Sequence, residues 1–303
     1  MIPAFLTTIF FSLSAIFATR SARLLGAATA NLARLFMALL MLGLWAHLFG
    51  QGLRGASFPW FFLSGFIGYG LGDVALFEAF TRIGPRLTML LVHCLAVPIA
   101  TVMENLWLGT KLHPLEIACI CVILSGVCIA LTPVRHLNIK RGIFWSGTFF
   151  GIFASLGQAG GAVISRKAYQ IATLSGLHID GGTAAYQRML GGILVAGAFT
   201  LIIRFKSGNG EAVPGRGPHS RKLAWLFVAL NAITGPALGV ACFQLALAIS
   251  PSGIVLPVVA TTPVVAIPLI WMIDHDRPSL RSIVGGIIAV AGTVALARVA
   301  SQG

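Results

Sequence analysis

The stretch that decides the fold is GYGLGDVALFEAFTRIGPRLTMLLVHCLAVPIA, residues 68–100, because its pattern returns at residues 235–268 as GPALGVACFQLALAISPSGIVLPVVATTPVVAIP. The repeat pairs these residues: Gly68 with Gly235, Gly72 with Gly239, Glu78 with Gln244, and Pro98 with Pro263. Each copy reads as two apolar helices joined by a short turn. A repeated pair of long apolar helices indicates a membrane bundle built from two related halves.

The composition places the chain in a membrane. Its residues are 57% hydrophobic and 10% charged, with a mean hydropathy of +0.92. A soluble domain carries about 25% charged residues, which is what covers a surface that faces water. The formal charge of +13 does not indicate nucleic-acid binding, because the basic residues lie almost entirely between the apolar runs. The sequence therefore predicts an all-α integral membrane protein.

Ten apolar segments can be drawn, and we expect each to form a transmembrane helix. Those of the first half are residues 2–19, 29–50, 58–80, 85–109 and 114–131. Those of the second half are residues 143–165, 183–203, 223–248, 251–273 and 280–299. Because five is odd, the second half, 136–303, enters the membrane in the opposite sense to the first, 1–135. The prediction is ten transmembrane helices as two inverted five-helix repeats.

The positive charges predict the orientation. The connections on the side of the termini hold five Lys and Arg residues, and those on the other side hold fourteen. Basic loops stay in the cytoplasm, so this count predicts that both termini face outward. We expect a multi-pass protein of the plasma membrane, with the bacterial inner membrane as the favoured location.

The repeated stretches also resemble a known group. FEAFTRIGPRLTMLLVHCLAVPIA and FQLALAISPSGIVLPVVATTPVVA are similar to the motif ALRYTSAALAALLLSLAPVF of the drug/metabolite transporter superfamily, specifically its EamA-type members. The following stretches, GTKLHPLEIACICVILSGV and DHDRPSLRSIVGGIIAVAGTV, resemble the turn and the G-x-x-L-I-x-x-G helix of that family. The resemblance covers essentially the whole chain and implies export or exchange of small metabolites.

The chain departs from the family pattern at two points. Thr110 and Asp276 stand where the family has a turn glutamate, so the resemblance carries no role over to Glu104, which lies inside a helix. The resemblance also implies cytoplasmic termini, in conflict with the charge count. We retain the orientation that the charge count predicts.

Ionisable side chains inside a membrane are costly, so each one is a candidate for function. The candidates are Arg34, Asp73, Glu78, His93, Glu104 and Arg188. Polar side chains that could line a cavity join them, and these include Tyr69, Gln158 and Gln244.

Asp73 and Glu78 each allow two interpretations. Asp73 follows Gly68 and Gly72 on a helix that another helix can approach closely, so it is either a site for a proton or cationic group or the ion-pair partner of Arg34. Glu78 stands four residues before Arg82, the order that favours a structural ion pair on a helix.

His93 and Glu104 lie eleven residues apart, about three turns, and therefore share a helix face. Pro98 lies between them and can break the helix, as Pro263 can in the second half. Broken helices at matching places of two halves indicate a transport site. His93 suits either a proton relay or a neutral hydrogen-bonded role.

Two pairs of arginines occupy matching places in the halves: Arg34 with Arg188, and Arg20 with Arg166. Arg34 and Arg188 are expected a few residues inside their helices. Each either extends to the membrane interface or binds an anionic substrate or a carboxylate.

The sequence favours a secondary transporter that moves a small metabolite by export or exchange, with a midplane site between the halves and protons as a candidate coupling ion. It has no Walker-type loop and no motif of a membrane hydrolase, and no cofactor or metal site is expected. A multi-pass membrane enzyme and a non-transporting scaffold remain as alternatives.

Overall fold

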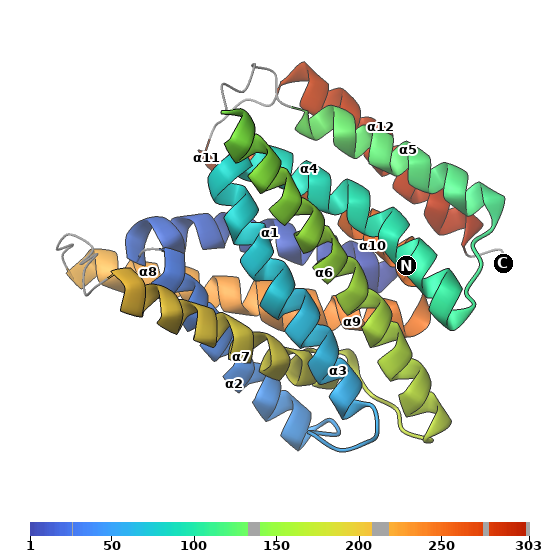
Figure 1. Cartoon of the computed structure of the whole chain (residues 1–303), viewed down its shortest axis with the longest axis horizontal. Coiled ribbons are helices and arrows are strands. Elements are labelled where there is room, and N and C mark those ends of the chain that lie inside the picture. The colour runs from blue at the N-terminus through green and yellow to red at the C-terminus, as the bar shows by residue number, and fades with distance from the viewer. Residues whose placement is uncertain (26, 133–139, 208–217, 275–278, 301–303) are drawn as a thin grey trace.

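The computed structural model describes residues 1–25, 27–132, 140–207, 218–274 and 279–300, and all of their regular secondary structure is helical (Figure 1). The helices are α1 (Ile2–Leu25), α2 (Ala27–Leu48), α3 (Phe58–Gly65), η1 (Phe66–Gly72), α4 (Asp73–Leu108), α5 (Pro114–Leu131), α6 (Arg141–Leu174), α7 (Gly181–Ser207), α8 (Pro218–Ala232), η2 (Ile233–Gly239), α9 (Val240–Ile249), α10 (Ser252–Val259), α11 (Thr262–Asp274) and α12 (Leu280–Val299).

Nine helical stretches among these described residues are long and apolar enough to cross a membrane. They match nine of the ten expected segments. The remaining segment, 183–203, lies within α7 but is not among the nine, so the count of ten stays a prediction. The proposed boundary between the halves, 135/136, falls outside the described residues, as does Asp276. Large apolar side chains cover the outside of the molecule, as lipid contact requires.

Two segments have the wider π-helical geometry, and they occupy positions that the sequence repeat pairs. The π-helix η1 has the sequence FIGYGLG and η2 has the sequence ITGPALG. Gly68 and Gly72 in η1 leave room for the backbone of α6 at Gly157 and Gly161, and Pro236 in η2 cannot donate a hydrogen bond to the preceding turn. π-helical turns are rare in proteins, and those that occur are often at functional sites.

The helix α4 bends at Gly84, where φ is 77° and ψ is 164°. This conformation is open to glycine, and the following proline disfavours helical geometry at the residue before it. The expected break at Pro98 is not found: residues 87–108 form one continuous span, and Pro98 is exposed on its surface. A single missing hydrogen bond is tolerated in a membrane helix whose other turns stay bonded. Pro263, in contrast, is the second residue of α11, next to the break between α10 and α11.

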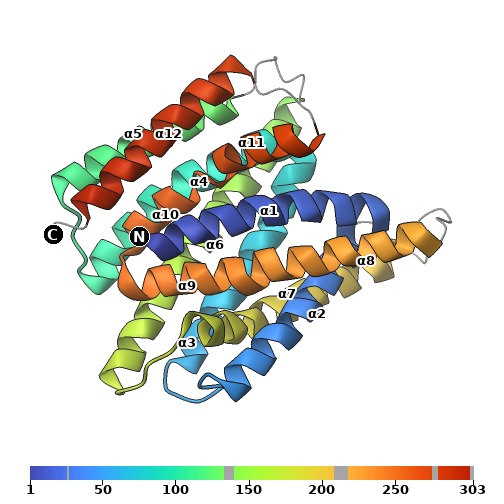
Figure 2. The same cartoon turned by 180° about the vertical axis from the view of Figure 1, so that it is seen from behind.

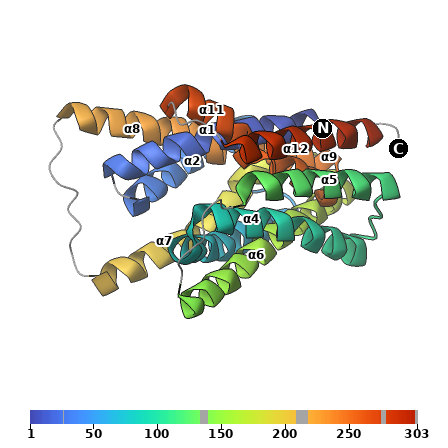
Figure 3. The same cartoon turned by 90° about the horizontal axis from the view of Figure 1, so that it is seen from above.

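The helices pack as two bundles. The first bundle comprises α3, η1, α4, α6 and α7, and the second comprises α1, α2, α8, η2, α9, α10 and α11. Figure 3 shows α4, α6 and α7 on one side of the molecule and α1, α8 and α11 on the other. The remaining helices, α5 and α12, pack against each other along the outside (Figure 2). Each bundle therefore combines helices from both halves of the sequence.

One end of the molecule carries the start of α1, the end of α12 and the turns that follow α4 and α9. We call it the terminus face, and both chain ends lie there in Figure 1. The other end, where α2 and α8 begin, is the opposite face.

Candidate functional site

A small pocket of about 50 Å³ lies between the bundles. Its walls come from α2, η1, α4 and α7, and its lining residues are Asn31, Leu35, Tyr69, Asp73, Val74, Met189, Gly192, Ala196 and Phe199. A space of this size holds one or two water molecules. Asp73 is the acidic group of this lining, and it follows the end of η1 directly.

Asp73 lies within electrostatic reach of both Arg34 and Arg188. It forms no ion pair with either within the described part of the chain. Arg34 instead donates from Nε to Asn31 Oδ1 at 2.8 Å, one turn away on the same helix. The interpretation of Asp73 as the ion-pair partner of Arg34 is therefore not found in this conformation, and the carboxylate remains available at the pocket.

Arg188 is buried, with 3% of its surface exposed, so it does not extend to the membrane interface. Its Cζ lies 4.9 Å from the ring centroid of Tyr69 and 5.9 Å from that of Phe243. Neither Nε nor Nη1 has a hydrogen-bond partner among the residues described. Within the described ranges, the guanidinium is thus held by aromatic rings and by no carboxylate.

Glycines make the space for this guanidinium. A Cβ at Gly68 would lie 3.2 Å from Arg188 Nη2, and one at Gly161 would lie 3.3 Å from it. The hydroxyl of Tyr169, also in electrostatic reach of Arg188, is another buried group without a partner in the described structure. Cation–π contact contributes about 2 kcal/mol at a desolvated site, whereas each unmade hydrogen bond costs about 1–3 kcal/mol. The aromatic rings alone therefore leave Arg188 unsatisfied.

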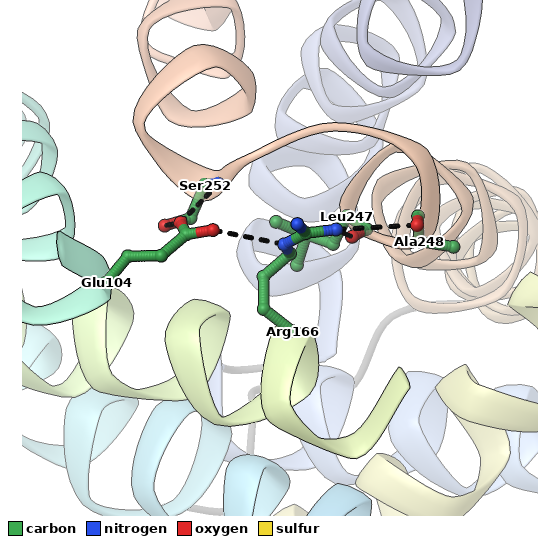
Figure 4. A network of polar contacts seen from close by, with 5 residues as sticks. All are labelled: Glu104, Arg166, Leu247, Ala248 and Ser252. Atoms are coloured by element: carbon green, nitrogen blue, oxygen red, sulfur yellow. Dashed lines mark hydrogen bonds and ion pairs between the residues drawn. The ribbon is translucent and has the colours of Figure 1, made fainter. Parts of the chain in front are cut away.

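A second polar cluster joins the two bundles at the terminus face (Figure 4). The Glu104 carboxylate accepts from Arg166 Nε at 3.1 Å and from the backbone N–H of Ser252 at 2.7 Å, and also from the Ser252 hydroxyl. Arg166 Nη1 in turn donates to the carbonyl of Leu247 at 2.8 Å. Glu104 is 2% exposed, and each of its oxygens has a partner.

We call Glu104, Arg166 and Ser252 the latch. Glu104 and Arg166 belong to the first bundle, on α4 and α6, while Ser252 begins α10 in the second bundle. Each charged member also binds backbone of the second bundle: Glu104 accepts from Ser252 N–H, and Arg166 donates to the carbonyl of Leu247. Separating the bundles here would break these charge-assisted hydrogen bonds, so the latch joins the two bundles at the terminus face.

The other predicted site residues lie apart from these two clusters. Glu78 forms the expected ion pair with Arg82, whose guanidinium stacks over Phe150. His93 is buried, and neither ring nitrogen has a partner in the structure as described. It shares a helix with Glu104, but the two side chains make no contact within the described structure, and their Cα atoms are about 16 Å apart by helical rise.

The two glutamines differ in burial. Gln158 is half-buried on α6. Gln244 on α9 is fully buried, and both amide atoms lack partners within the described ranges. A buried amide without a partner is unusual, so Gln244 stays a candidate.

The candidate list from the sequence omits four residues of these clusters. They are Arg166, Tyr169, Phe243 and Ser252. The sequence could have marked Arg166 as a candidate, because the repeat pairs it with Arg20. It was left out because it was expected just past the end of its helix. Among the described residues, no group of His, Cys, Asp and Glu could hold a metal ion.

Comparisons with known proteins agree with this architecture. The EamA-like transporter family matches residues 1–132 and 145–298. A solved structure described only as the crystal structure of a protein is similar in fold, with a TM-score of 0.75 and 16% identity over 99% of this chain and 97% of that chain. No curated protein matches the chain. Because the family match spans nearly its whole length, the chain belongs to the EamA-like transporter family, a group of multi-pass membrane transporters of the drug/metabolite type.

Proposed function

We propose that this protein is a secondary transporter that moves a small metabolite by alternating access, with its substrate site at the pocket beside Asp73. The observation that carries the proposal is the buried Arg188, whose Nε and Nη1 have no partner among the described residues. Its guanidinium lies over Tyr69, a ring that also lines the pocket between the two bundles. A membrane-buried charge without a partner is too costly to be kept for packing alone. The family match favours transport over a membrane enzyme or a scaffold.

The moving units in this proposal are the two bundles, in place of the sequence halves 1–135 and 136–303. The packing of α6 against α4 and η1, and of α1 against α8 and η2, supports this choice. The matching positions of η1 and η2 support the proposed inverted repeats, because each π-helix interrupts the third helix of its half. Ten transmembrane helices remain part of the proposal.

The latch sets the state of the transporter in this scheme. It closes the terminus face, so the substrate enters and leaves the pocket from the opposite face in this conformation. The repeat does not place a second glutamate at the opposite face. Glu104 stands six residues after Pro98, whereas Leu269 stands six residues after Pro263. Arg20, the counterpart of Arg166, stacks over Phe227.

With the termini outside, as the charge count predicts, the latch closes the outer face and the pocket faces the cytoplasm. That arrangement suits export or exchange from a bacterial inner membrane. Asp73 is the proposed carrier if protons couple the movement, because its carboxylate lines the pocket and has no hydrogen-bond or ion-pair partner in the described chain.

The test is a comparison of metabolites in the medium of cells that overproduce the intact protein, the Asp73→Asn variant or the empty vector, at matched membrane levels. The intact protein should release a small set of compounds, and Asp73→Asn should release less of them. Arg141→Gln removes an exposed charge at the start of α6 and serves as the control that retains release. Profiles from the intact protein that match the empty vector in both uptake and release assays would refute transport.

A further inference from the structure

The groups around the pocket do not balance in charge. Arg34 and Arg188 contribute two positive charges within electrostatic reach of a single carboxylate, Asp73. Arg34 has Asn31 as a hydrogen-bond acceptor. Arg188 has only 3% of its surface exposed, yet its Nε and Nη1 have no hydrogen-bond partner in the part of the chain that the structure describes. The site therefore lacks one negative charge, and the deficit is at Arg188.

We propose that Arg188 binds a carboxylate of the transported molecule, and that Tyr69 and Phe243 contact a planar apolar part of the same molecule. This inference rests on the proposed function and names the substrate class of that site: amphipathic monocarboxylates. A guanidinium presents its donors in a planar fork that matches the two oxygens of a carboxylate. The aromatic faces that now cover it offer a surface for a flat group.

A single charge fits this site better than a double one. One added negative charge neutralises the two arginines together with Asp73, whereas a phosphate dianion would add repulsion against the Asp73 carboxylate. A neutral ligand would leave the guanidinium unpaired. The charge count thus favours a carboxylate over both a phosphate and a neutral metabolite.

Tyr69 connects the pocket with Arg188. This ring belongs both to the pocket lining and to the aromatic pair over the guanidinium. Along α7, Phe199 of the pocket lies eleven residues nearer the opposite face than Arg188, about 16 Å by helical rise. A molecule that enters from that face meets Asp73 and Phe199 first, and a turn of the Tyr69 ring brings its carboxylate to Arg188.

The experiment measures ligand binding to the full chain, purified in lipid nanodiscs. The probes are three acids, acetate, benzoate and indole-3-acetate, each paired with its neutral amide, and phenylphosphonate. At least one aromatic acid should bind ten-fold or more tightly than its amide, and more tightly than acetate or phenylphosphonate. Equal binding of every acid and its amide, or preference for phenylphosphonate, would overturn the inference.

Variants assign the effect to Arg188. Arg188→Gln should abolish the preference for the acid, while Arg188→Lys retains part of it, because the positive charge remains without the fork. Arg141→Gln, which removes an exposed arginine, should keep the full preference. An unchanged preference in a folded Arg188→Gln variant contradicts the assignment. If Arg188→Gln does not fold, Tyr69→Ala provides the second measurement and should weaken binding of the aromatic acids more than that of acetate.

The two proposals can fail separately. Release of a compound without a carboxylate, unaffected by Arg188→Gln, would leave the transport function standing and remove the substrate class. Loss of all release in every assay, with acid binding retained, would remove the transport function and leave the carboxylate site.

Discussion

Glu104 and Arg166 form an ion pair of 3.1 Å between Oε1 and Nε, and each of them also binds the backbone of the opposing bundle. Their side chains are 2% and 16% exposed. The pair therefore differs from a surface salt bridge, because its charges have exchanged most of their water for protein donors and acceptors.

Loss of either partner should destabilise the protein strongly. Glu104→Ala and Arg166→Ala should each lower the free energy of unfolding by about 3–5 kcal/mol, because each leaves a desolvated charge behind. The double variant should lose less than the sum. The measurement is a double-mutant cycle from unfolding in detergent micelles. Glu78 and Arg82, about one-third exposed, are the control pair, with a coupling of at most about 1 kcal/mol. Additive losses at the latch would contradict the prediction.

The latch should also control access from the terminus face. In a background with the five native cysteines replaced by alanine, Leu247→Cys introduces a thiol at a fully buried position of α9. Adding Glu104→Gln should raise its labelling by a membrane-impermeant maleimide about ten-fold, which corresponds to about 1.4 kcal/mol of lost closure. Leu174→Cys, exposed at the end of α6, should be labelled equally in both backgrounds. Equal labelling at position 247 would show that the latch does not set access.

The contact between α5 and α12 should tolerate no added side chain. A Cβ at Gly126 would lie 2.4 Å from the backbone nitrogen of Ala289 and 2.6 Å from the carbonyl oxygen of Gly285. Gly126→Ala should therefore lower the free energy of unfolding by about 1–3 kcal/mol. Gly197→Ala is the matched control, since nothing lies within 4 Å of its Cβ, and it should raise that free energy by up to about 1 kcal/mol. Equal effects in thermal unfolding would contradict this account.

Asp180, in the connection between α6 and α7, should make stability depend on pH. Burial alone raises the pKa of its carboxyl, but hydrogen bonds from the Thr183 side chain and backbone, the Trp45 indole and the Gly182 N–H outweigh burial and hold the pKa below its ordinary value of 3.8. A carboxyl with a lowered folded-state pKa stabilises the fold above its unfolded value, and the contribution is lost as pH falls further.

Unfolding temperatures measured between pH 7 and pH 3 should therefore fall below about pH 4. Asp180→Asn should weaken that fall and should also lower the stability at pH 7, because the cap of α7 and the bond to Trp45 lose a charged acceptor. The prediction fails if the intact protein and Asp180→Asn show the same pH profile.

The sequence was sufficient for the features that depend on composition and on spacing. Apolar length located nine spans. The glycines that the repeat pairs lie in η1 and η2, although the π-helical geometry there was not predicted. The pairing of Glu78 with Arg82 also followed from spacing alone, since four residues on a helix bring two side chains to the same face.

The burial and the partners of each charged side chain could not be predicted from composition or spacing. They depend on how far a helix extends and how it is rotated in the bundle. Residues 143–165 were expected as a span, but α6 continues to Leu174, which brings Arg166 inside the helix and opposite Glu104. Arg188 was expected either to extend to the membrane interface or to bind an anion. Its burial depends on the close approach of Gly68, which spacing along the sequence does not show. Contacts between distant segments decide both outcomes.

The paired π-helices have a mechanical consequence. A π-helical turn contains about one residue more than an α-helical turn, and one residue of an α-helix corresponds to a rotation of about 100° and a rise of about 1.5 Å. Asp73 begins the helix directly after η1, and Val240 begins the helix directly after η2. A one-residue change of register in either π-helix would therefore rotate and shift the helix that follows it, while the preceding helix stays in place. Such a change at η1 would turn Asp73, and such a change at η2 would turn Gln244 in the other bundle.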